Sequence, residues 1–152
     1  MNKLDLIAHD IRSRENVGSL FRTCDSLGVN KLWLTGYTPR PPDAKISKVA
    51  LGAEQAVVFE YAPDVFEVIA RLKRNGVTVY ALELAPDATD LADVHSSGPL
   101  ALVLGTETTG VPPSVIEACD GAIKITQQGM KESMNVGVAA GIAAWAILHN
   151  QR

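Results

Sequence analysis

The stretch LALVLGTETTGV, residues 100–111, carries the pattern that is most informative about the fold. Residues 100–104 are all apolar, and Gly105 follows them directly. A strand with one solvated face alternates apolar and polar residues, whereas a strand buried on both faces is a continuous apolar run. The stretch therefore predicts a strand inside a sheet whose two faces are both covered.

Segments of this kind alternate along the chain with segments of helical periodicity. In residues 16–28, apolar side chains recur at helical spacing, and Gly28 can end the helix. Parallel strands need a crossover connection, which is usually a helix. The alternation therefore predicts an α/β fold, with a parallel sheet covered by helices on both faces. The other expected strands are 4–10, 29–35, 56–61, 77–84 and 121–126; the other expected helices are 45–53, 64–76, 112–119 and one that starts near Ser133; 86–93 is expected to be an acidic surface loop.

Length and composition favour one compact domain over residues 1–152. The net charge of −3 does not indicate a nucleic-acid-binding protein, so an RNA contact would need a local basic patch. No signal-peptide pattern opens the chain, and its longest apolar run, 134–148, is too short for a membrane span. Cys24 and Cys119 lack the spacing of a metal or redox site. They favour buried, reduced thiols in a cytoplasmic protein. We expect no metal site and no membrane contact.

Three loops are candidates for a functional site because each follows an expected strand. Parallel α/β sheets bind ligands beyond the carboxyl ends of their strands. The loops are residues 10–16, 105–111 and 126–135. These loops hold the polar, charged and glycine residues that are candidates for a functional role. Each loop also has a purely structural interpretation.

The first loop leads into a helix that carries Asn16, Gly18 and Arg22. Asn16 can cap this helix, and Gly18 in its first turn lets another backbone or a ligand approach closely. Arg12 and Arg14 add positive charge at the same place. Taken alone, the pattern favours a capped helix with solvated arginines.

The second loop places Glu107 between Gly105 and Gly110, where a ligand of this sheet would bind. Glycine-rich turns after a strand often cradle a nucleotide, but this one lacks the third glycine and the long helix of a dinucleotide site. No Gly-Lys-Ser/Thr follows, so it is not a phosphate-binding P-loop either. A plain turn with an exposed glutamate is the structural alternative.

The third loop ends in Ser133 and Asn135, either of which can cap the last helix. One cap suffices, so the other side chain is free to face a site. Within the helix, Gly137, Gly141 and Trp145 recur every four residues, and apolar residues occupy the other faces too. A helix that is apolar all round is buried all round, which predicts either a deeply threaded helix or a subunit interface.

Together the three loops resemble the SpoU (TrmH-type) branch of the knotted SPOUT RNA methyltransferases. The family pattern Asn-x-Gly-x-x-x-Arg matches residues 16–22, and Gly-x-Glu-x-x-Gly matches residues 105–110. The third motif, Ile-Pro-Met followed by Ser-Leu-Asn-Val-Ser, corresponds to residues 125–127 and 133–137. Three positions depart from the family pattern, namely Thr126, Gln127 and Gly137. The lip of the cofactor pocket is therefore expected to differ from that of the family.

The resemblance implies a C-terminal trefoil knot, a homodimer, and methylation of a ribose 2′-hydroxyl in RNA with S-adenosylmethionine. The chain is similar to the minimal members, so tRNA is the first expected substrate and rRNA the second. DNA lacks the 2′-hydroxyl and is expected to be inert. By resemblance, the catalytic residues are Arg22, Asn16, Glu107, Ser133 and Asn135, the cofactor contacts lie near Leu82, Gly105, Ile125, Ser133 and Met134, and RNA contacts come from Arg12, Arg14 and Arg22.

Arg22 is the family's candidate for activating the hydroxyl, although a guanidinium is a poor base because it hardly releases its proton. Binding of a phosphate beside the ribose and stabilisation of a developing alkoxide are the alternatives. Glu107 is expected to fix the geometry of the site, for example by pairing with an arginine. Asn16 is expected to orient Arg22 or the ribose.

Two other functions stay open on the sequence. One is an inactive, dimeric module of the same fold that binds the cofactor or RNA, which the altered residues 125–127 suggest. The other is a doubly wound domain that binds a different nucleotide, with accidental motif matches. Binding of S-adenosylmethionine distinguishes the last from the first two, and methyl incorporation into RNA distinguishes the enzyme from the inactive module.

Overall fold

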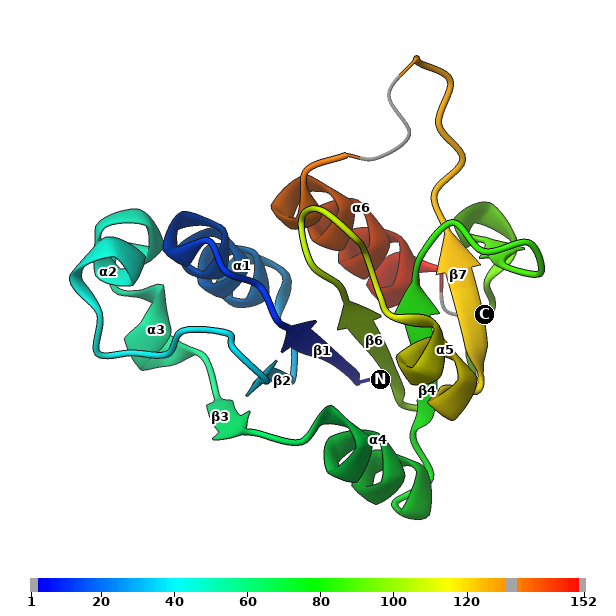
Figure 1. Cartoon of the computed structure of the whole chain (residues 1–152), viewed down its shortest axis with the longest axis horizontal. Coiled ribbons are helices and arrows are strands. Elements are labelled where there is room, and N and C mark those ends of the chain that lie inside the picture. Colours follow the sequence, from blue (N-terminus) through cyan, green and yellow to red (C-terminus); the bar gives the residue numbers. More distant parts are fainter. Residues whose placement is uncertain (1–2, 131–133, 151–152) are drawn as a thin grey trace.

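The computed structural model describes residues 3–130 and 134–150, and its strands form one sheet (Figure 1). The strands are β1 (Leu4–His9), β2 (Lys31–Thr35), β3 (Phe59–Ala62), β4 (Thr78–Leu82), β5 (Thr89–Asp90), β6 (Leu100–Leu104) and β7 (Gly121–Lys124). The helices are α1 (Arg14–Leu27), α2 (Ala44–Ala50), α3 (Ala53–Ala56), α4 (Val65–Arg74), the 3-10 helix η1 (Leu91–Asp93), α5 (Pro113–Ala118) and α6 (Val136–His149). The strand order is β3-β2-β1-β6-β4-β7-β5, and all six strand pairs are parallel. The predicted parallel α/β sheet is confirmed.

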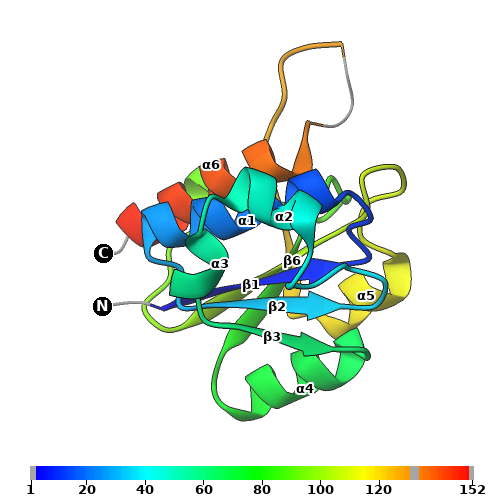
Figure 2. The same cartoon turned by 90° about the vertical axis from the view of Figure 1, so that its left-hand side faces the viewer.

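Helices cover both faces of this sheet, with α1, α2 and α6 on one side and α4 and α5 on the other (Figure 2). The position of β6 between two cores explains why its sequence is apolar throughout. Leu100, Leu102 and Leu104 join the core under α1 and α6, whereas Ala101 and Val103 join the core under α4 and α5. All five side chains are at most 2% exposed. A polar residue anywhere in this run would lose its hydration on either face.

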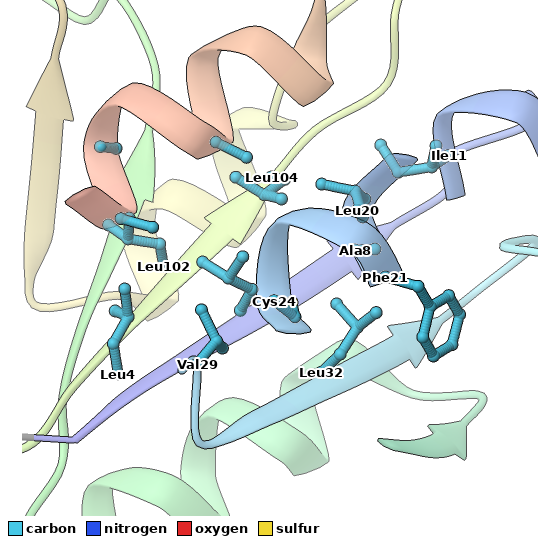
Figure 3. Close-up of a cluster of buried hydrophobic side chains, with 14 of the residues drawn as sticks. Leu4, Ala8, Ile11, Leu20, Phe21, Cys24, Val29, Leu32, Leu102 and Leu104 are labelled. Atoms are coloured by element: carbon cyan, nitrogen blue, oxygen red, sulfur yellow. The ribbon is translucent and has the colours of Figure 1, made fainter. Parts of the chain in front are cut away.

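The larger core lies between the sheet and helices α1 and α6 (Figure 3). Its aromatic contact is an edge-to-face pair of Phe21 and Phe59, with ring centroids 5.1 Å apart. Cys24 belongs to this core and Cys119 to the one on the opposite face, and both are free thiols. Burial raises the pKa of Cys24 to about 12 and the pKa of Cys119 to about 11, which keeps both thiols protonated at neutral pH. The predicted pair of buried, unbridged cysteines is confirmed.

Helix α1 begins at Arg14, earlier than predicted, because Ser13 is its cap. The Ser13 hydroxyl accepts a 3.1 Å hydrogen bond from the backbone N–H of Asn16. The prediction that Asn16 caps the helix is therefore wrong. The predicted end is right, since Gly28 closes the helix with a left-handed φ of 71°.

The stretch 86–93, predicted to be an acidic surface loop, contains β5 and η1 instead. The short strand β5 pairs with β7 at the edge of the sheet. Leu91 is only 7% exposed and belongs to the same core as α6. The connection from β4 to β6 therefore packs against the C-terminal helix, which also contacts α1 and β1.

We predicted that α6 is buried all round, either by a deep position in the fold or by a second subunit. Within the single chain, α6 leaves one apolar stripe at the surface. Val138, Ile142 and Trp145 are 55%, 42% and 56% exposed. Trp145 stacks on His149 with ring centroids 4.7 Å apart, so it does not continue the glycine stripe that faces α1. Within residues 3–130 and 134–150, no helix combines the length and the hydropathy that crossing a membrane requires.

Gly18→Ala is expected to lower the free energy of unfolding by about 1–3 kcal/mol. Helices α1 and α2 meet closely here, and a Cβ on Gly18 would lie 2.7 Å from the carbonyl oxygen of Ile46 and 2.8 Å from Cβ of Val49. The partner of Gly18 is thus the neighbouring helix. Gly141→Ala is the matched control, because its Cβ would meet only Thr23 Cγ2, at 3.9 Å.

In that control, the better helix propensity of alanine is expected to raise the free energy of unfolding by up to about 1 kcal/mol. Urea denaturation at equal protein concentration should therefore shift the two midpoints in opposite directions. Equal shifts would contradict the tight crossing of α1 and α2.

Candidate functional site

A cavity of about 630 Å³ opens at the carboxyl ends of the central strands. Because β1, β6, β4 and β7 are neighbours in the sheet, the segments that follow them converge here. All three segments singled out in the sequence contribute to the cavity, and the end of β4 adds a fourth. The lining residues are Asn16, Leu82, Glu83, Leu84, Leu104, Gly105, Thr106, Glu107, Thr108, Thr109, Gly110, Ile125, Gln127, Met134, Asn135, Val136 and Ala139.

The wall that follows β6 is a tight turn. The backbones of Thr106 and Gly110 exchange two hydrogen bonds, of 3.2 and 3.1 Å. Gly105 packs directly on this turn, and a Cβ there would lie 2.2 Å from backbone atoms of both Gly110 and Val111. The backbone N–H of Val111 donates a 2.7 Å hydrogen bond to Oε2 of Glu83, which ties the turn to the end of β4. Gly105 is therefore required by the turn itself, and the turn forms part of the cavity.

Two asparagines from distant parts of the chain meet at the cavity. Asn135 caps α6, since its Oδ1 accepts hydrogen bonds from the N–H groups of Gly137 and Val138 at 2.9 and 3.2 Å. Its amide nitrogen donates to Oδ1 of Asn16 at 3.3 Å, across 119 residues of sequence. Ser13 takes over the capping of α1, so the Asn16 side chain is available to this contact.

Glu107 lies on the exposed part of the turn after β6 and reaches the segment after β1. Its Oε1 accepts a long hydrogen bond of 3.4 Å from the backbone N–H of Ser13. Among the described residues no arginine forms an ion pair with Glu107, so the expected pairing stays a prediction. Glu107, Asn16 and Asn135 are the predicted catalytic residues that line the cavity. Ser133 lies outside the described residues.

The predicted arginines are not among the residues that line the cavity. Arg22 lies on an exposed part of α1, almost two turns beyond the residue that reaches the cavity. Arg12 and Arg14 line a second hollow, of about 360 Å³, together with Tyr37 and Pro39. The three predicted arginines therefore lie outside the lining of the cavity.

The cavity fits S-adenosylmethionine in its chemistry. Leu82, Gly105, Ile125 and Met134, the predicted cofactor residues within the described chain, all line it. Apolar side chains at the ends of β4 and β6 and at the start of α6 offer a surface for an adenine ring. Strand ends and the turn after β6 bring backbone N–H and C=O groups to the cavity for polar atoms. The carboxylate of Glu107 suits a positively charged sulfonium.

Sequence reasoning missed Glu83 and the threonines of the turn after β6. Glu83 directly follows an apolar strand at its carboxyl end, and this position was the signal that could have identified it. The hydroxyls of Thr106 and Thr109 lie 2.6 Å apart, and the N–H of Thr109 donates to Oγ1 of Thr106 at 2.9 Å. These bonds stabilise the turn from within.

The three departures from the SpoU pattern have separate structural positions. The Thr126 hydroxyl donates a hydrogen bond to Asp90, and this bond holds the pKa of Asp90 below its ordinary value. Gly137 faces α1, where a Cβ would lie 3.3 Å from Oγ of Ser19. Of the three, Gln127 alone lines the cavity. The expected difference at the lip of the cofactor pocket is therefore confined to the side chain of Gln127.

The model of the SpoU rRNA Methylase family matches residues 3–145, nearly the whole chain. The chain belongs to the SpoU methyltransferase family. It is 34% identical over 139 residues to the tRNA (guanosine(18)-2′-O)-methyltransferase of Thermus thermophilus. The matched residues make up 91% of this chain and 71% of that protein. It is 32% identical over 138 residues to the 23S rRNA (guanosine-2′-O-)-methyltransferase RlmB of Vibrio parahaemolyticus. That match makes up 90% of this chain and 55% of the Vibrio protein. The expected enzyme class, a SpoU-family RNA 2′-O-methyltransferase, is confirmed.

Solved structures of RNA-modifying proteins superpose on nearly the whole chain. The A. aeolicus TrmH/SpoU tRNA modifying enzyme has a TM-score of 0.88 at 26% identity and covers 99% of this chain and 76% of its own. The AdoMet-bound rRNA methyltransferase of Sinorhizobium meliloti has a TM-score of 0.85 at 25% identity and covers 95% of this chain and 55% of its own. A structure concerned with 2′-OH methylation of C/U34 on tRNA has a TM-score of 0.83 at 25% identity and covers 95% of this chain and 93% of its own.

These likenesses confirm the SPOUT knot fold and S-adenosylmethionine as the cofactor of the fold. Within this chain, α6 packs against both α1 and η1.

Proposed function

We propose that this SpoU chain transfers a methyl group from S-adenosylmethionine to the ribose 2′-hydroxyl of a nucleotide in tRNA. The observation that carries the proposal is the convergence of the three motif segments on one cavity, with Asn16 and Asn135 in contact. The Thermus relative and the C/U34 structure favour tRNA over other RNA. The similarity to 23S rRNA methyltransferases keeps rRNA as the second candidate substrate.

Methyl transfer to a hydroxyl is an in-line displacement, which requires alignment of the reacting atoms and loss of the hydroxyl proton. Bound S-adenosylmethionine supplies an electrophilic methyl group on a sulfonium centre. Asn135 occupies Oδ1 of Asn16, which directs the Asn16 amide and leaves its N–H groups to donate to a ribose oxygen. Glu107 holds the segment after β1 through Ser13.

Arg22 acts on the substrate side of the site. A guanidinium keeps its proton, so Arg22 is assigned to stabilise a developing alkoxide or to bind the phosphate beside the ribose. Arg12 and Arg14, which line the second hollow, are assigned to contact the RNA. Ser133 is assigned, with Asn135, to placing the substrate. These roles account for an RNA substrate on a chain whose overall charge is −3.

We also infer a cytoplasmic homodimer. The exposed stripe of Val138, Ile142 and Trp145 is apolar and continuous along one side of α6, which is typical of a face that a second subunit covers. Buried, protonated cysteines suit a reducing compartment. Light scattering at several protein concentrations tests the dimer directly.

Asn135→Asp is expected to keep the free energy of unfolding within about 0.5 kcal/mol of the wild type, because aspartate caps helices as well as asparagine does. Its carboxylate still accepts from Gly137 and Val138 but cannot donate to Asn16. Methyl transfer is expected to fall at least about tenfold, since Asn16 then turns its N–H groups toward the carboxylate and away from a ribose oxygen. Asn135→Ala loses both the cap and the contact and serves as comparison. Wild-type transfer in Asn135→Asp would show that the contact is dispensable.

The proposed function is tested by incorporation of radiolabelled methyl groups from S-adenosylmethionine into total tRNA and total rRNA. We expect label in tRNA, as a 2′-O-methyl nucleoside that resists alkaline cleavage of its phosphodiester, and none in DNA. Label in rRNA alone would overturn the substrate assignment. Cofactor binding without transfer to either RNA would favour the inactive module. Sequencing of modified nucleotides in RNA from a deletion strain then identifies the position.

A further inference from the structure

The hollow lined by Arg12, Arg14, Tyr37 and Pro39 is distinct from the cofactor cavity and contains an exposed aromatic ring. The Tyr37 side chain is 79% exposed. The segments after β1 and β2 that form the hollow lie at the same end of the sheet as the turn after β6 (Figure 2). An exposed ring of this kind is accessible to a stacking partner, and the structure around it shows how it is held.

The turn that carries Tyr37 is rigidly built. The backbone N–H of Tyr37 donates a 2.7 Å hydrogen bond to Oδ1 of Asp10. The next side chain, Thr38, is 3% exposed; its hydroxyl donates to the carbonyl of Ala8 at 2.8 Å and accepts from the N–H of Ile11 at 3.0 Å. These bonds tie the turn to the end of β1 on both sides of the exposed ring. Tyr37 is therefore held at the surface by its neighbours and has little backbone freedom to lose on binding.

Gly36 reinforces this arrangement. Its φ of 63° is left-handed, and its carbonyl accepts a 3.2 Å hydrogen bond from the hydroxyl of Tyr61. The guanidinium of Arg40 lies 4.0 Å from the centroid of the Tyr61 ring. The turn after β2 is thus bonded to β1 at one end and to β3 at the other.

Two arginines line the hollow beside the ring, and they differ in how far carboxylates neutralise them. Arg12 is exposed and forms no ion pair within the described part of the chain. Arg14 is paired with Asp43 through a 3.2 Å contact, in which the aspartate also caps α2. An exposed aromatic face beside unneutralised guanidinium is the combination that binds single-stranded nucleic acid, in which bases stack and phosphates pair with arginine.

The hollow also adjoins the reaction site. Ser13 lies between Arg12 and Arg14 in the chain, and its backbone N–H contacts Glu107, which lines the cofactor cavity. A nucleotide that stacks on Tyr37 would therefore stand beside the nucleotide whose ribose enters the cavity.

We propose that Tyr37 is a stacking platform for an unpaired base of the substrate RNA next to the methylated nucleotide, with Arg12 binding the adjoining phosphate. This subsite rests on the proposed function for the identity of its ligand. It implies that the substrate nucleotide lies in a single-stranded loop, because bases within a helix are stacked on each other and cannot reach the ring.

The test measures binding of fluorescein-labelled U10 RNA and of unmodified tRNA by anisotropy, and steady-state methylation of tRNA, with the full chain. Tyr37→Ala is expected to weaken U10 binding about tenfold and to raise KM for tRNA by a similar factor, with kcat changed less than about twofold. Tyr37→Phe keeps the ring and should stay within about twofold of the wild type. Phe66→Ala removes an exposed ring, 45% accessible, from α4 on the other face of the sheet and should change nothing.

Arg12→Ala is expected to weaken binding and to reduce the slope of log affinity against log salt by about one, whereas Arg12→Lys keeps the slope. Wild-type affinity for U10 in Tyr37→Ala, or no binding of U10 by the wild type, overturns the subsite. Failure of the proposed function looks different, because the wild type would then transfer no methyl group to RNA. The U10 measurement needs no turnover and still decides the subsite in that case.

Discussion

Gly105→Ala is expected to reduce methyl transfer about 100-fold and to lower the free energy of unfolding by about 1–3 kcal/mol. The added Cβ would lie 2.2 Å from the carbonyl carbon of Gly110 and from the nitrogen of Val111. Both are backbone atoms, so no side-chain rotation relieves the clash. The turn must move away from β6, which breaks the hydrogen bond from Val111 to Glu83 and displaces a wall of the cofactor cavity.

Gly98→Ala is the matched control for this prediction. A Cβ there meets nothing within 4 Å, and the residue precedes β6 at its opposite end. Calorimetry with S-adenosylmethionine and thermal unfolding should show a wild-type profile for Gly98→Ala. For Gly105→Ala, the two measurements should show weakened binding and a lowered midpoint. Wild-type cofactor affinity in Gly105→Ala would mean that the cofactor does not use this turn.

Arg22→Ala is expected to lower kcat at least about 100-fold while the Kd for S-adenosylmethionine stays within about twofold. Arg22 is exposed on α1 and is not among the residues that line the cofactor cavity, so its loss leaves the cofactor contacts intact. Under the proposed role, the same loss removes the cation assigned to the developing alkoxide or to the adjoining phosphate. Single-turnover methylation of tRNA, with cofactor saturating, measures the effect.

Two further arginine variants test whether the charge or the shape of Arg22 matters and whether the effect is specific to its position. Arg22→Lys keeps the charge but not the planar fork, so partial recovery indicates a point-charge role and no recovery indicates bidentate binding. Arg74→Ala removes an exposed arginine from the end of α4, on the other face of the sheet, and should retain full activity. Full activity in Arg22→Ala would contradict the assigned role of this residue and leave the rest of the site to carry catalysis.

Much of the fold was predictable because the local pattern of apolar residues indicates which side chains are buried. The run at 100–104 is apolar at every position because two cores, one on each face, receive its side chains alternately. Gly28 marks the end of α1 because the left-handed conformation there suits glycine. The segments 10–16, 105–111 and 126–135 could be selected because parallel strands deliver their carboxyl ends to one edge.

Several features could not be predicted from local patterns. Ser13 and Asn16 are both good caps, and the choice between them depends on how the chain leaves β1. The local sequence around Leu91 is that of an acidic surface loop, and only the packing of helix α6 against η1 buries this side chain. The apolar stripe of α6 looked buried because hydropathy does not say whether another element or another subunit covers a face.

The sequence by itself determined the class of fold, the two-sided burial of the sheet and the family, because these follow from periodicity, spacing and motif order. Only the tertiary structure decided that Asn16 meets Asn135 across 119 residues and that Arg22 stays outside the cofactor cavity. It also decided that the partner of Gly18 is helix α2. The reason is physical: strand order and helix packing determine which distant side chains meet, and neither is encoded in any single stretch of chain.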